Sequence, residues 1–380
     1  MDISFRLDPE VLIGQDVINR VGAFCSRSGS RVLITTEQVL YEGRSIERLT
    51  GILEEAGVEA IIFDEIPAQA TADVAEAAAS LARGARCSAI VGFGGLKTQA
   101  IARLSAILAS SNLPVFELLD GREAEGDFLP YIAVPTTGRD PFLFSDYFIA
   151  VDPRDRSVKL VKSPARLCAA AFIDGNLSES LSGAFAATTA FDGFCVAVEA
   201  YCSSRASFFS DALLEQAVAI YSRMMESYLD NQIFDMVGNS TNAGFLIALG
   251  AAISAPGIGT ALSYAINGRF PVAKSWCSTV ILPYILERLV SARPEKIAKV
   301  AALMGEPVEG ASVADSANMA VDTIRRRMGA LKTPARLKEF NLSLDKLVSV
   351  AEAARNLEFV AYSPWTVSAE DSFDILKQAF

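Results

Sequence analysis

The chain has 380 residues, more than one ordinary domain holds, and 51% of them are apolar, so it has enough apolar residues for a large folded core. Its 34 Lys and Arg against 45 Asp and Glu give a net charge of −11, which disfavours a nucleic acid partner, because proteins that bind nucleic acid usually present a basic face. The sequence contains no histidine, which excludes imidazole as a base, an acid or a metal ligand.

The first half of the chain alternates between strand and helix patterns. Short runs rich in β-branched residues predict strands at 31–36, 58–63, 89–91 and 131–134. Amphipathic or alanine-rich stretches between them predict helices at 46–56, 71–83 and 96–109. Such alternation is typical of a parallel sheet covered by helices on both faces, so we expect an α/β domain over residues 1–176.

The second half is rich in alanine and leucine at helical spacing and poor in β-branched runs. It predicts helices at 181–206, 211–230, 244–254, 260–266, 275–290, 298–304, 314–328 and 344–354. We therefore expect an all-helical domain over residues 177–380. A basic run, Arg325-Arg326-Arg327, is interpreted as the solvated face of one of these helices.

Residues 236–268 carry no charge and are long enough to span a bilayer. Polar residues interrupt the stretch, and Pro256-Gly257 would break a helix halfway, so we expect two buried helices and no membrane span. The first residues lack the apolar core of a signal peptide, and the six cysteines are scattered without a metal-binding spacing. These features indicate a cytoplasmic protein with small buried thiols.

A glycine-rich turn, Val91-Gly92-Phe93-Gly94-Gly95, follows a predicted strand and opens a predicted helix. Gly92, Gly94 and Gly95 would let the backbone approach a pyrophosphate at the N-terminus of that helix. A tight strand-to-helix turn without a ligand explains the same glycines. Glu37, just after the strand at 31–36, can accept hydrogen bonds from a ribose diol or be an ordinary solvated acid.

Several motifs follow one another along nearly the whole chain. They are Thr36-Glu37, Gly92-Phe93-Gly94-Gly95, Val134-Pro135-Thr136-Thr137, the run Asp-Gly-Phe-Cys-Val-Ala-Val-Glu-Ala-Tyr from Asp192 to Tyr201, Ile281-Leu282-Pro283 and Ser363-Pro364. Their order and spacing resemble the iron-containing (group III) alcohol dehydrogenase family, in the wider dehydroquinate synthase-like superfamily. The resemblance implies an α/β nucleotide-binding domain, an all-helical domain and an active-site cleft between them.

The resemblance also implies a divalent metal held by one Asp and three His, and here the sequence departs from the family. By position these ligands fall on Asp192, Val196, Thr260 and Lys274, so only the aspartate is kept. Valine has no donor atom, threonine is a poor neutral ligand, and a lysine would repel a cation. We therefore expect no iron or zinc at this place. A further family histidine, a proton relay, falls on Tyr264.

Without the metal, Lys274, Tyr264 and Asp192 are the candidate catalytic residues. A lysine ammonium in the vacated place can carry part of the charge that the metal would hold beside an alkoxide. Tyr264 would relay the proton, and Asp192 would orient Lys274 as its counter-charge. In the alternative, Lys274 and Asp192 form only a buried ion pair that repairs the loss of the metal, and Tyr264 is a core phenol.

The cofactor that the resemblance implies is NAD or NADP. Thr136 and Thr137 would line its adenosine side, and Arg139 in the next loop either contacts a phosphate or is a surface charge. Glu37 would repel a 2′-phosphate, which favours NAD.

We therefore expect a metal-independent NAD(P)-dependent alcohol dehydrogenase or carbonyl reductase, specialised as a tailoring enzyme. Its substrate would be a small-molecule or peptide alcohol or carbonyl compound, and the family resemblance suggests a homodimer without membrane or nucleic acid partners. The alternative is a catalytically inactive relative of the family that binds a nucleotide or a protein. A non-redox, carbocycle-forming reaction is disfavoured, because that chemistry also uses a metal elsewhere in the superfamily.

Overall fold

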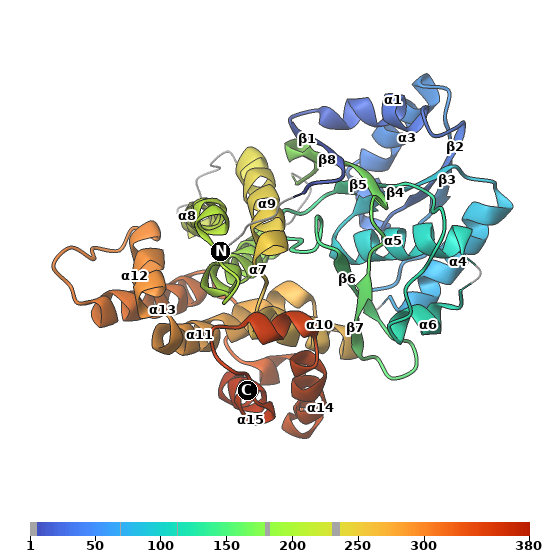
Figure 1. Cartoon of the computed structure of the whole chain (residues 1–380). Coiled ribbons are helices and arrows are strands. Elements are labelled where there is room, and N and C mark those ends of the chain that lie inside the picture. The colour runs from blue at the N-terminus through green and yellow to red at the C-terminus, as the bar shows by residue number, and fades with distance from the viewer. Residues whose placement is uncertain (1–5, 69, 112, 179–182, 230–235) are drawn as a thin grey trace. The chain divides into compact units, whose positions relative to one another are not determined.

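The chain folds into two compact units in the computed structural model, which describes residues 6–68, 70–111, 113–178, 183–229 and 236–380 (Figure 1). The first unit comprises the chain up to Gly138 together with Phe144–Ser180, and the second comprises Arg139–Leu143 together with Leu181–Phe380. The sequence analysis assigned the segment Arg139–Leu143 to the first domain, whereas its contacts are with the second unit.

A six-stranded parallel sheet forms the centre of the first unit, as the alternating pattern predicted. Its strands, in spatial order, are β1 (Glu10–Gly14), β8 (Cys168–Asp174), β5 (Tyr131–Pro135), β4 (Ala89–Gly94), β2 (Arg31–Thr35) and β3 (Glu59–Phe63). The chain moves outward from β2 to β3 and then returns to the other side of β2 with β4. The direction of winding therefore reverses between β2 and β4.

Helices cover both faces of this sheet, so the predicted α/β architecture is confirmed (Figure 1). They are α1 (Val21–Cys25), α2 (Val39–Glu42), α3 (Ser45–Glu55), α4 (Ala72–Gly84), α5 (Leu96–Ser110) and α6 (Val115–Leu119). On one face, apolar side chains of α1 and α3 pack against alternate residues of the central strands, among them Val32 and Val91. On the other face, α5 packs against β4 and α4.

A two-stranded antiparallel sheet, β6 (Tyr147–Val151) and β7 (Val158–Lys162), was not predicted. Both strands are short, and the turn between them carries Asp, Pro and Arg residues that are typical of loops. Asp152 shapes this turn, because its backbone N–H donates to Ser157 O and its carboxylate accepts the N–H of Arg154.

In the described residues of the second unit, the regular secondary structure is helical, as predicted (Figure 1). Its helices are α7 (Gly183–Cys202), α8 (Phe208–Leu229), α9 (Met236–Ile253), α10 (Ile258–Arg269), α11 (Lys274–Ala292), α12 (Pro294–Leu303), α13 (Val313–Ala330), α14 (Leu344–Arg355) and α15 (Ala369–Ala379). The start of the predicted helix 181–206 and the last residue of the predicted helix 211–230 lie outside the described residues.

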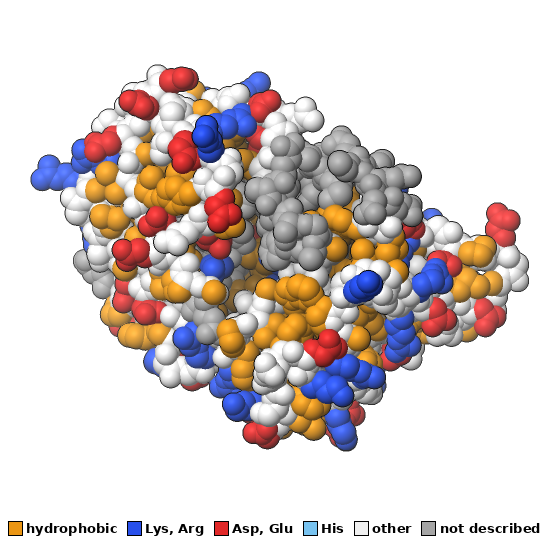
Figure 2. Space-filling view, turned by 180° about the vertical axis from the view of Figure 1, so that it is seen from behind, with side chains coloured by type: hydrophobic (Ala, Val, Ile, Leu, Met, Phe, Trp, Pro, Cys, Tyr) orange, Lys and Arg blue, Asp and Glu red, His pale blue; other side chains and the backbone are white. Residues whose placement is uncertain are grey.

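The long uncharged stretch forms α9 and α10, which are separated at Pro256-Gly257 as predicted. Among the described helices, none is by itself long and apolar enough to cross a membrane; the stretches Asn239–Ile253 and Ile258–Arg269 reach that length only together, and they are bent by 109°. On the face of the molecule in Figure 2, acidic and basic side chains are interspersed with apolar ones.

Candidate functional site

The carboxyl ends of β2 and β4 lie side by side at the point where the winding of the sheet reverses. Thr35 of β2 is paired with Gly92 of β4, so the residues that follow each strand emerge at the same edge. In open parallel sheets, ligands bind outside the carboxyl ends of strands at such a reversal. This edge carries Glu37 after β2 and Gly95 after β4, the residues predicted to hold a dinucleotide.

The three positions of the turn require glycine to different degrees. A Cβ on Gly92 would lie 2.8 Å from Gln99 Oε1. A Cβ on Gly94, where φ is +156°, would lie 2.8 Å from Thr98, so the protein's own packing demands glycine at both positions. A Cβ on Gly95 would meet nothing closer than Glu37 Oε1 at 3.8 Å. The protein itself therefore does not require glycine at 95, and the open space there suits a ligand that approaches the backbone closely.

Gln99, which the sequence analysis did not single out, holds the glycine turn in place. Its amide Nε2 donates to the carbonyl oxygens of Gly92 at 2.8 Å and Gly94 at 3.0 Å, and its Oε1 accepts from the hydroxyl of Tyr131. Gln99 is almost fully buried, so these partners are not replaced by water. It is a positioning residue for the turn.

Replacing Gln99 by leucine is expected to weaken NADH binding by about tenfold or more. The variant removes the hydrogen bonds of Gln99 to the Tyr131 hydroxyl and to two turn carbonyls, which costs about 1–3 kcal/mol of stability. Calorimetric titration with NADH and thermal unfolding measure the two effects. Gln378→Leu, at an exposed position on α15, is the control; an unchanged affinity in Gln99→Leu would show that the turn does not depend on this side chain.

Glu37 is held by the first turn of α5. Thr98 Oγ1 donates to Glu37 Oε1 at 2.5 Å, and Lys97 Nζ lies 3.4 Å from Glu37 Oε2. The predicted ribose acceptor is thus in place beside Gly95, but both of its oxygens already face donors. Its contact with a ribose stays a prediction.

Thr136 and Thr137 follow β5 at the same edge of the sheet. The backbone N–H of Thr136 donates to Gly94 O at 3.1 Å, which joins this segment to the glycine turn. Among the described residues, the buried hydroxyls of Thr137 and of Thr36 have no hydrogen-bond partner. Buried hydroxyls are normally paired, so these two fit a polar ligand at the edge. With the space at Gly95, the residues present fit a dinucleotide.

A second polar cluster lies inside the second unit, around the carboxylate of Asp192 on α7. Lys274 Nζ at the start of α11 donates to Oδ1, Ser278 Oγ one turn later donates to Oδ1 at 2.6 Å, and Arg139 Nη1 donates to Oδ2 at 2.6 Å. All three charged residues are buried. Their formal charges sum to +1, so the cluster brings a positive charge into the interior.

The two cations act directly on the ionisation of Asp192. Burial opposes ionisation, but the charges of Lys274 and Arg139 and the hydrogen bonds from Lys274 and Ser278 outweigh it, so the pKa of Asp192 lies below its ordinary value. Asp192 is therefore a carboxylate, which fixes the position of both cations.

Arg139 has a different partner from the one predicted. The sequence analysis placed it against a cofactor phosphate or on the surface, whereas the structure pairs it with Asp192 and buries it. A surface position is therefore wrong, and a contact with cofactor phosphate stays a prediction. Arg139 is 53 positions from Asp192 in the sequence, so no local pattern relates them.

Tyr264 lies beside Lys274, as predicted. Lys274 Nζ is 4.7 Å from the centroid of the Tyr264 ring, a cation–π contact. The ring of Phe142 lies 6.0 Å from that of Tyr264 and 5.5 Å from that of Phe359. The segment Arg139–Leu143 thus supplies a cation to Asp192 and an aromatic ring to Tyr264.

The remaining positions of the family's metal site do not form a cation site. Thr260 Oγ1 donates to Glu199 at 2.6 Å, and the N–H groups of Gly257, Gly259 and Thr260 also donate to that carboxylate. Burial raises the pKa of Glu199, and these hydrogen bonds oppose the rise. Glu199 therefore holds the start of α10, and Thr260 is bound to it.

The residues present do not fit a divalent metal. Asp192 already accepts from two cations and a hydroxyl, Val196 offers no donor atom, and the ammonium of Lys274 would repel a metal ion. In the described part of the chain, no group of three or more His, Cys, Asp or Glu side chains is placed to hold one.

The basic run on α13 is solvated at Arg325 and Arg326, as interpreted from sequence, but not at Arg327. Arg327 is buried, and its guanidinium also donates to Ser222 Oγ at 2.9 Å. Each arginine binds a glutamate from another part of the fold: the pairs are Arg325–Glu287, Arg326–Glu306 and Arg327–Glu226. The run joins α13 to α11, to α8 and to the turn after α12.

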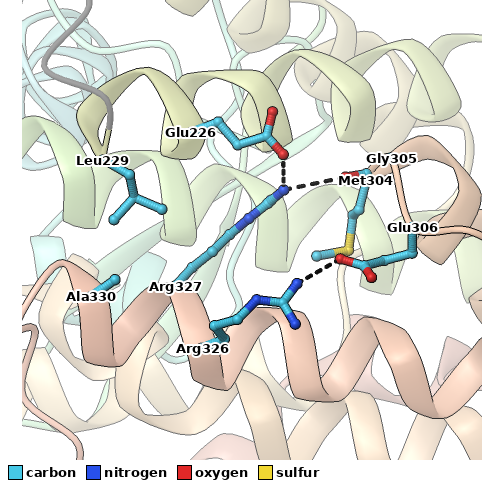
Figure 3. A pocket seen from close by; sticks show the side chains of 8 residues that line it. All are labelled: Glu226, Leu229, Met304, Gly305, Glu306, Arg326, Arg327 and Ala330. Atoms are coloured by element: carbon cyan, nitrogen blue, oxygen red, sulfur yellow. Dashed lines mark hydrogen bonds and ion pairs between the residues drawn. The ribbon is translucent and has the colours of Figure 1, made fainter.

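A cavity of about 730 Å³ lies at the end of α8, between α13 and the turn after α12 (Figure 3). Figure 3 shows that both arginines lining it, Arg326 and Arg327, already point at glutamates. None of the predicted site residues lines this cavity. It therefore adds nothing to the dinucleotide edge or to the Asp192 cluster.

The chain thus combines a parallel α/β unit that has a nucleotide-type edge with a helical unit that has a buried charged cluster. Residues 8–175 match the model of the family described as iron-containing alcohol dehydrogenase, and residues 186–380 match the model of the C-terminal part of that family. The chain belongs to the iron-containing alcohol dehydrogenase family, as the sequence motifs indicated.

The chain is similar to known proteins over its whole length. It is 25% identical to long-chain-alcohol dehydrogenase 1 of Geobacillus thermodenitrificans, over 97% of this chain and 94% of that protein. It is 23% identical to the NAD-dependent methanol dehydrogenase of Bacillus methanolicus, over 99% of each. A crystal structure of a 1,3-propanediol oxidoreductase superposes over the full length of both chains with a TM-score of 0.92 at 23% identity, and so shares the fold.

Proposed function

We propose that this chain is a metal-independent, NAD(P)-dependent alcohol dehydrogenase or carbonyl reductase. The observation that carries the proposal is the buried contact of Asp192 with both Lys274 and Arg139. By the family resemblance, Asp192 and Lys274 fall on two of the positions that would hold its metal. Relatives over the full length of the chain are alcohol dehydrogenases and reductases, which supports hydride chemistry on an alcohol or a carbonyl.

The charge of the Asp192 cluster suits a reaction in which an oxygen becomes negative. Lys274 and Arg139 both contact the carboxylate of Asp192, in an interior where charge interactions are stronger than in water. Lys274 would stabilise the alkoxide that forms when an alcohol loses its proton or when a carbonyl receives hydride. Asp192 would keep the ammonium in that place.

Tyr264 would hold and move the proton. Its ring lies 4.7 Å from Lys274 Nζ, so the phenol and the ammonium would act on the same substrate oxygen. In the reductive direction, Tyr264 Oη would donate a proton to the substrate oxygen, and in the oxidative direction it would accept one. When bound, the nicotinamide dinucleotide supplies or accepts the hydride.

The edge of the sheet in the first unit would bind the cofactor. Gly95 leaves space for a pyrophosphate, Gln99 keeps the turn in shape, and Thr36 and Thr137 have buried hydroxyls ready for polar partners. The name of the Bacillus methanolicus relative states NAD dependence, and a sulfoacetaldehyde reductase structure with the same fold contains NAD⁺. Both support a nicotinamide dinucleotide as cofactor.

We also propose a cytoplasmic homodimer that acts in a specialised biosynthetic step on a small-molecule or peptide alcohol or carbonyl. All six cysteines are free thiols, which suits a reducing compartment. Burial raises the pKa of Cys25 to about 12, which makes this thiol unreactive. Light scattering of the purified protein measures the oligomeric state.

The proposal predicts that chelator-treated protein binds NADH or NADPH with micromolar affinity. The residues that would hold the dinucleotide do not depend on a metal, so removing metal ions should leave binding and turnover unchanged. Nicotinamide fluorescence measures binding, and a substrate screen with and without chelator measures turnover. If neither cofactor binds at millimolar concentration, the dehydrogenase function is wrong, and an inactive homologue that binds another partner is favoured.

A further inference from the structure

The carboxylate of Glu37 carries its own counter-charge. Lys97 Nζ lies 3.4 Å from Oε2, and Thr98 Oγ1 donates to Oε1 at 2.5 Å. A carboxylate that selects NAD does so by binding both ribose hydroxyls and by repelling a 2′-phosphate. At this edge of the sheet, one oxygen of Glu37 is engaged by Thr98, and the negative charge is offset by a lysine on the next element.

The Lys97–Glu37 pair faces the place where a nucleotide would lie. The side chains of Lys97 and Glu37 are 29% and 26% exposed, so a ligand can reach them. Glu37 Oε1 and the unpartnered hydroxyl of Thr137 lie 3.8 Å and 3.9 Å from the position that a Cβ on Gly95 would take. The pair therefore borders the same space as the glycine turn.

Lys97 has the chemistry to bind a phosphate at this position. Its ammonium can turn from Glu37 to a phosphate oxygen, and a bond between two charged groups is stronger than one between neutral groups. Lys97 also belongs to the first turn of α5, where the helix dipole favours negative charge. A 2′-phosphate would thus meet the ammonium of Lys97 and the N-terminus of α5. The carboxylate of Glu37 would lie beside it, with its Oε1 engaged by Thr98.

We propose that Lys97 makes this site accept the 2′-phosphate of NADP(H), so that the protein binds NADPH at least as tightly as NADH. The inference rests on the proposed function, because it needs the same edge of the sheet to bind a dinucleotide. It reverses the preference for NAD that Glu37 alone predicts. Lys97 is a specificity-determining residue in this account, with no part in the hydride step.

The test compares the dissociation constants of NADH and NADPH for the full-length protein, by calorimetry and nicotinamide fluorescence. In the unmodified protein we expect NADPH to bind as tightly as NADH or more tightly. Lys97→Met should weaken NADPH binding by about tenfold and change NADH binding by less than about twofold. Lys97→Arg should keep the affinity for NADPH, because it restores the charge.

Two further variants separate this role from a general effect of charge. Lys162→Met removes a lysine that pairs with Glu123 in the same unit, on the separate β6–β7 sheet, and should leave both affinities unchanged. Glu37→Gln keeps an acceptor for Thr98 but removes the negative charge, so it should shift the preference further toward NADPH. Comparing the dissociation constants of adenosine 2′,5′-bisphosphate and 5′-AMP tests the same effect of the 2′-phosphate without the nicotinamide.

The outcomes distinguish this inference from the proposed function. If NADH binds with micromolar affinity but NADPH binds at least tenfold more weakly, or if Lys97→Met leaves the ratio of the two affinities unchanged, the role of Lys97 is wrong and the dehydrogenase proposal stands. If neither cofactor binds at millimolar concentration, both proposals fall.

Discussion

Replacing Lys274 by methionine is expected to lower kcat by about 10²- to 10³-fold, the usual cost of removing one group that stabilises a developing oxyanion. Methionine has nearly the same length as lysine but lacks the charge. The affinity for NAD(P)H should change little, because the dinucleotide edge lies in the other unit and contains no part of the Asp192 cluster. Steady-state kinetics together with cofactor titration separate the two effects.

The chain contains a matched control for this variant. Lys296 lies 4.3 Å from the centroid of the Tyr201 ring and binds the carboxylate of Asp211, so, like Lys274, it lies beside a tyrosine ring and an aspartate. Lys296→Met should leave kcat unchanged. Tyr264→Phe should reduce kcat, whereas Tyr201→Phe should not. If Lys274→Met retains full activity, the lysine is only a structural counter-charge and the proposed mechanism is wrong.

Replacing Asp192 by asparagine is expected to destabilise the protein by about 3–5 kcal/mol, because two buried cations lose their counter-charge. The carboxamide fills nearly the same volume, so packing is preserved while the charge is removed. Chemical denaturation at neutral pH measures the loss. Asp211→Asn removes a carboxylate from a partly exposed ion pair with Lys296 and should cost only about 0–1 kcal/mol.

The pH dependence of stability gives an independent measure of the same group. The pKa of Asp192 is lowered from its ordinary value of 3.8, so its ionised form stabilises the fold above that pH. This contribution shrinks as the pH falls below about 3.8, where the unfolded chain takes up the proton, and it is lost once the pH passes the lower pKa of the folded state. In Asp192→Asn, the free energy of unfolding should therefore fall less steeply with acid than in the unmodified protein.

A double variant tests whether Asp192 and Lys274 act as a pair. Adding Lys274→Met to Asp192→Asn removes one of the two unpaired cations and should restore part of the lost stability, since residues in one network do not contribute additively. A loss below about 1 kcal/mol in Asp192→Asn alone would contradict a buried, paired carboxylate.

The charged cluster gives the buried carboxylate of Asp192 its counter-charges from within the helical unit. A buried carboxylate needs a counter-charge, and Lys274 and Arg139 supply it from two directions, with Ser278 as a further donor. Glu199, two helical turns after Asp192 on α7, takes Thr260 and the N-terminus of α10 as its partners. Each buried acid of α7 is thus matched by donors from other helices.

Much of the architecture could be predicted from sequence because its signals are local. The alternation of β-branched runs with amphipathic helices indicated a parallel sheet, and Pro256-Gly257 marked the break between α9 and α10. The order of the motifs indicated the family, which the family models confirm. The hairpin β6–β7 was missed, since its short strands resemble the loops around them.

The sequence by itself placed Lys274 and Tyr264 together, because the family motifs relate their positions. It also contained the signal for Ser278, which lies four residues after Lys274 on one helix and so faces the same side. By contrast, the two partners that change the chemistry of the predicted site residues could not be found this way. They are Arg139 for Asp192 and Lys97 for Glu37.

Only the tertiary structure decided those two contacts, for a physical reason. Arg139 reaches Asp192 because the segment Arg139–Leu143 leaves the sheet and packs with the helical unit, which no local periodicity records. Lys97 reaches Glu37 because β2 and β4 are adjacent in the sheet although β3 and α4 separate them in the chain. Strand order and packing make these residues neighbours, and their opposite charges then pair. Sequence spacing alone contains neither the strand order nor the packing.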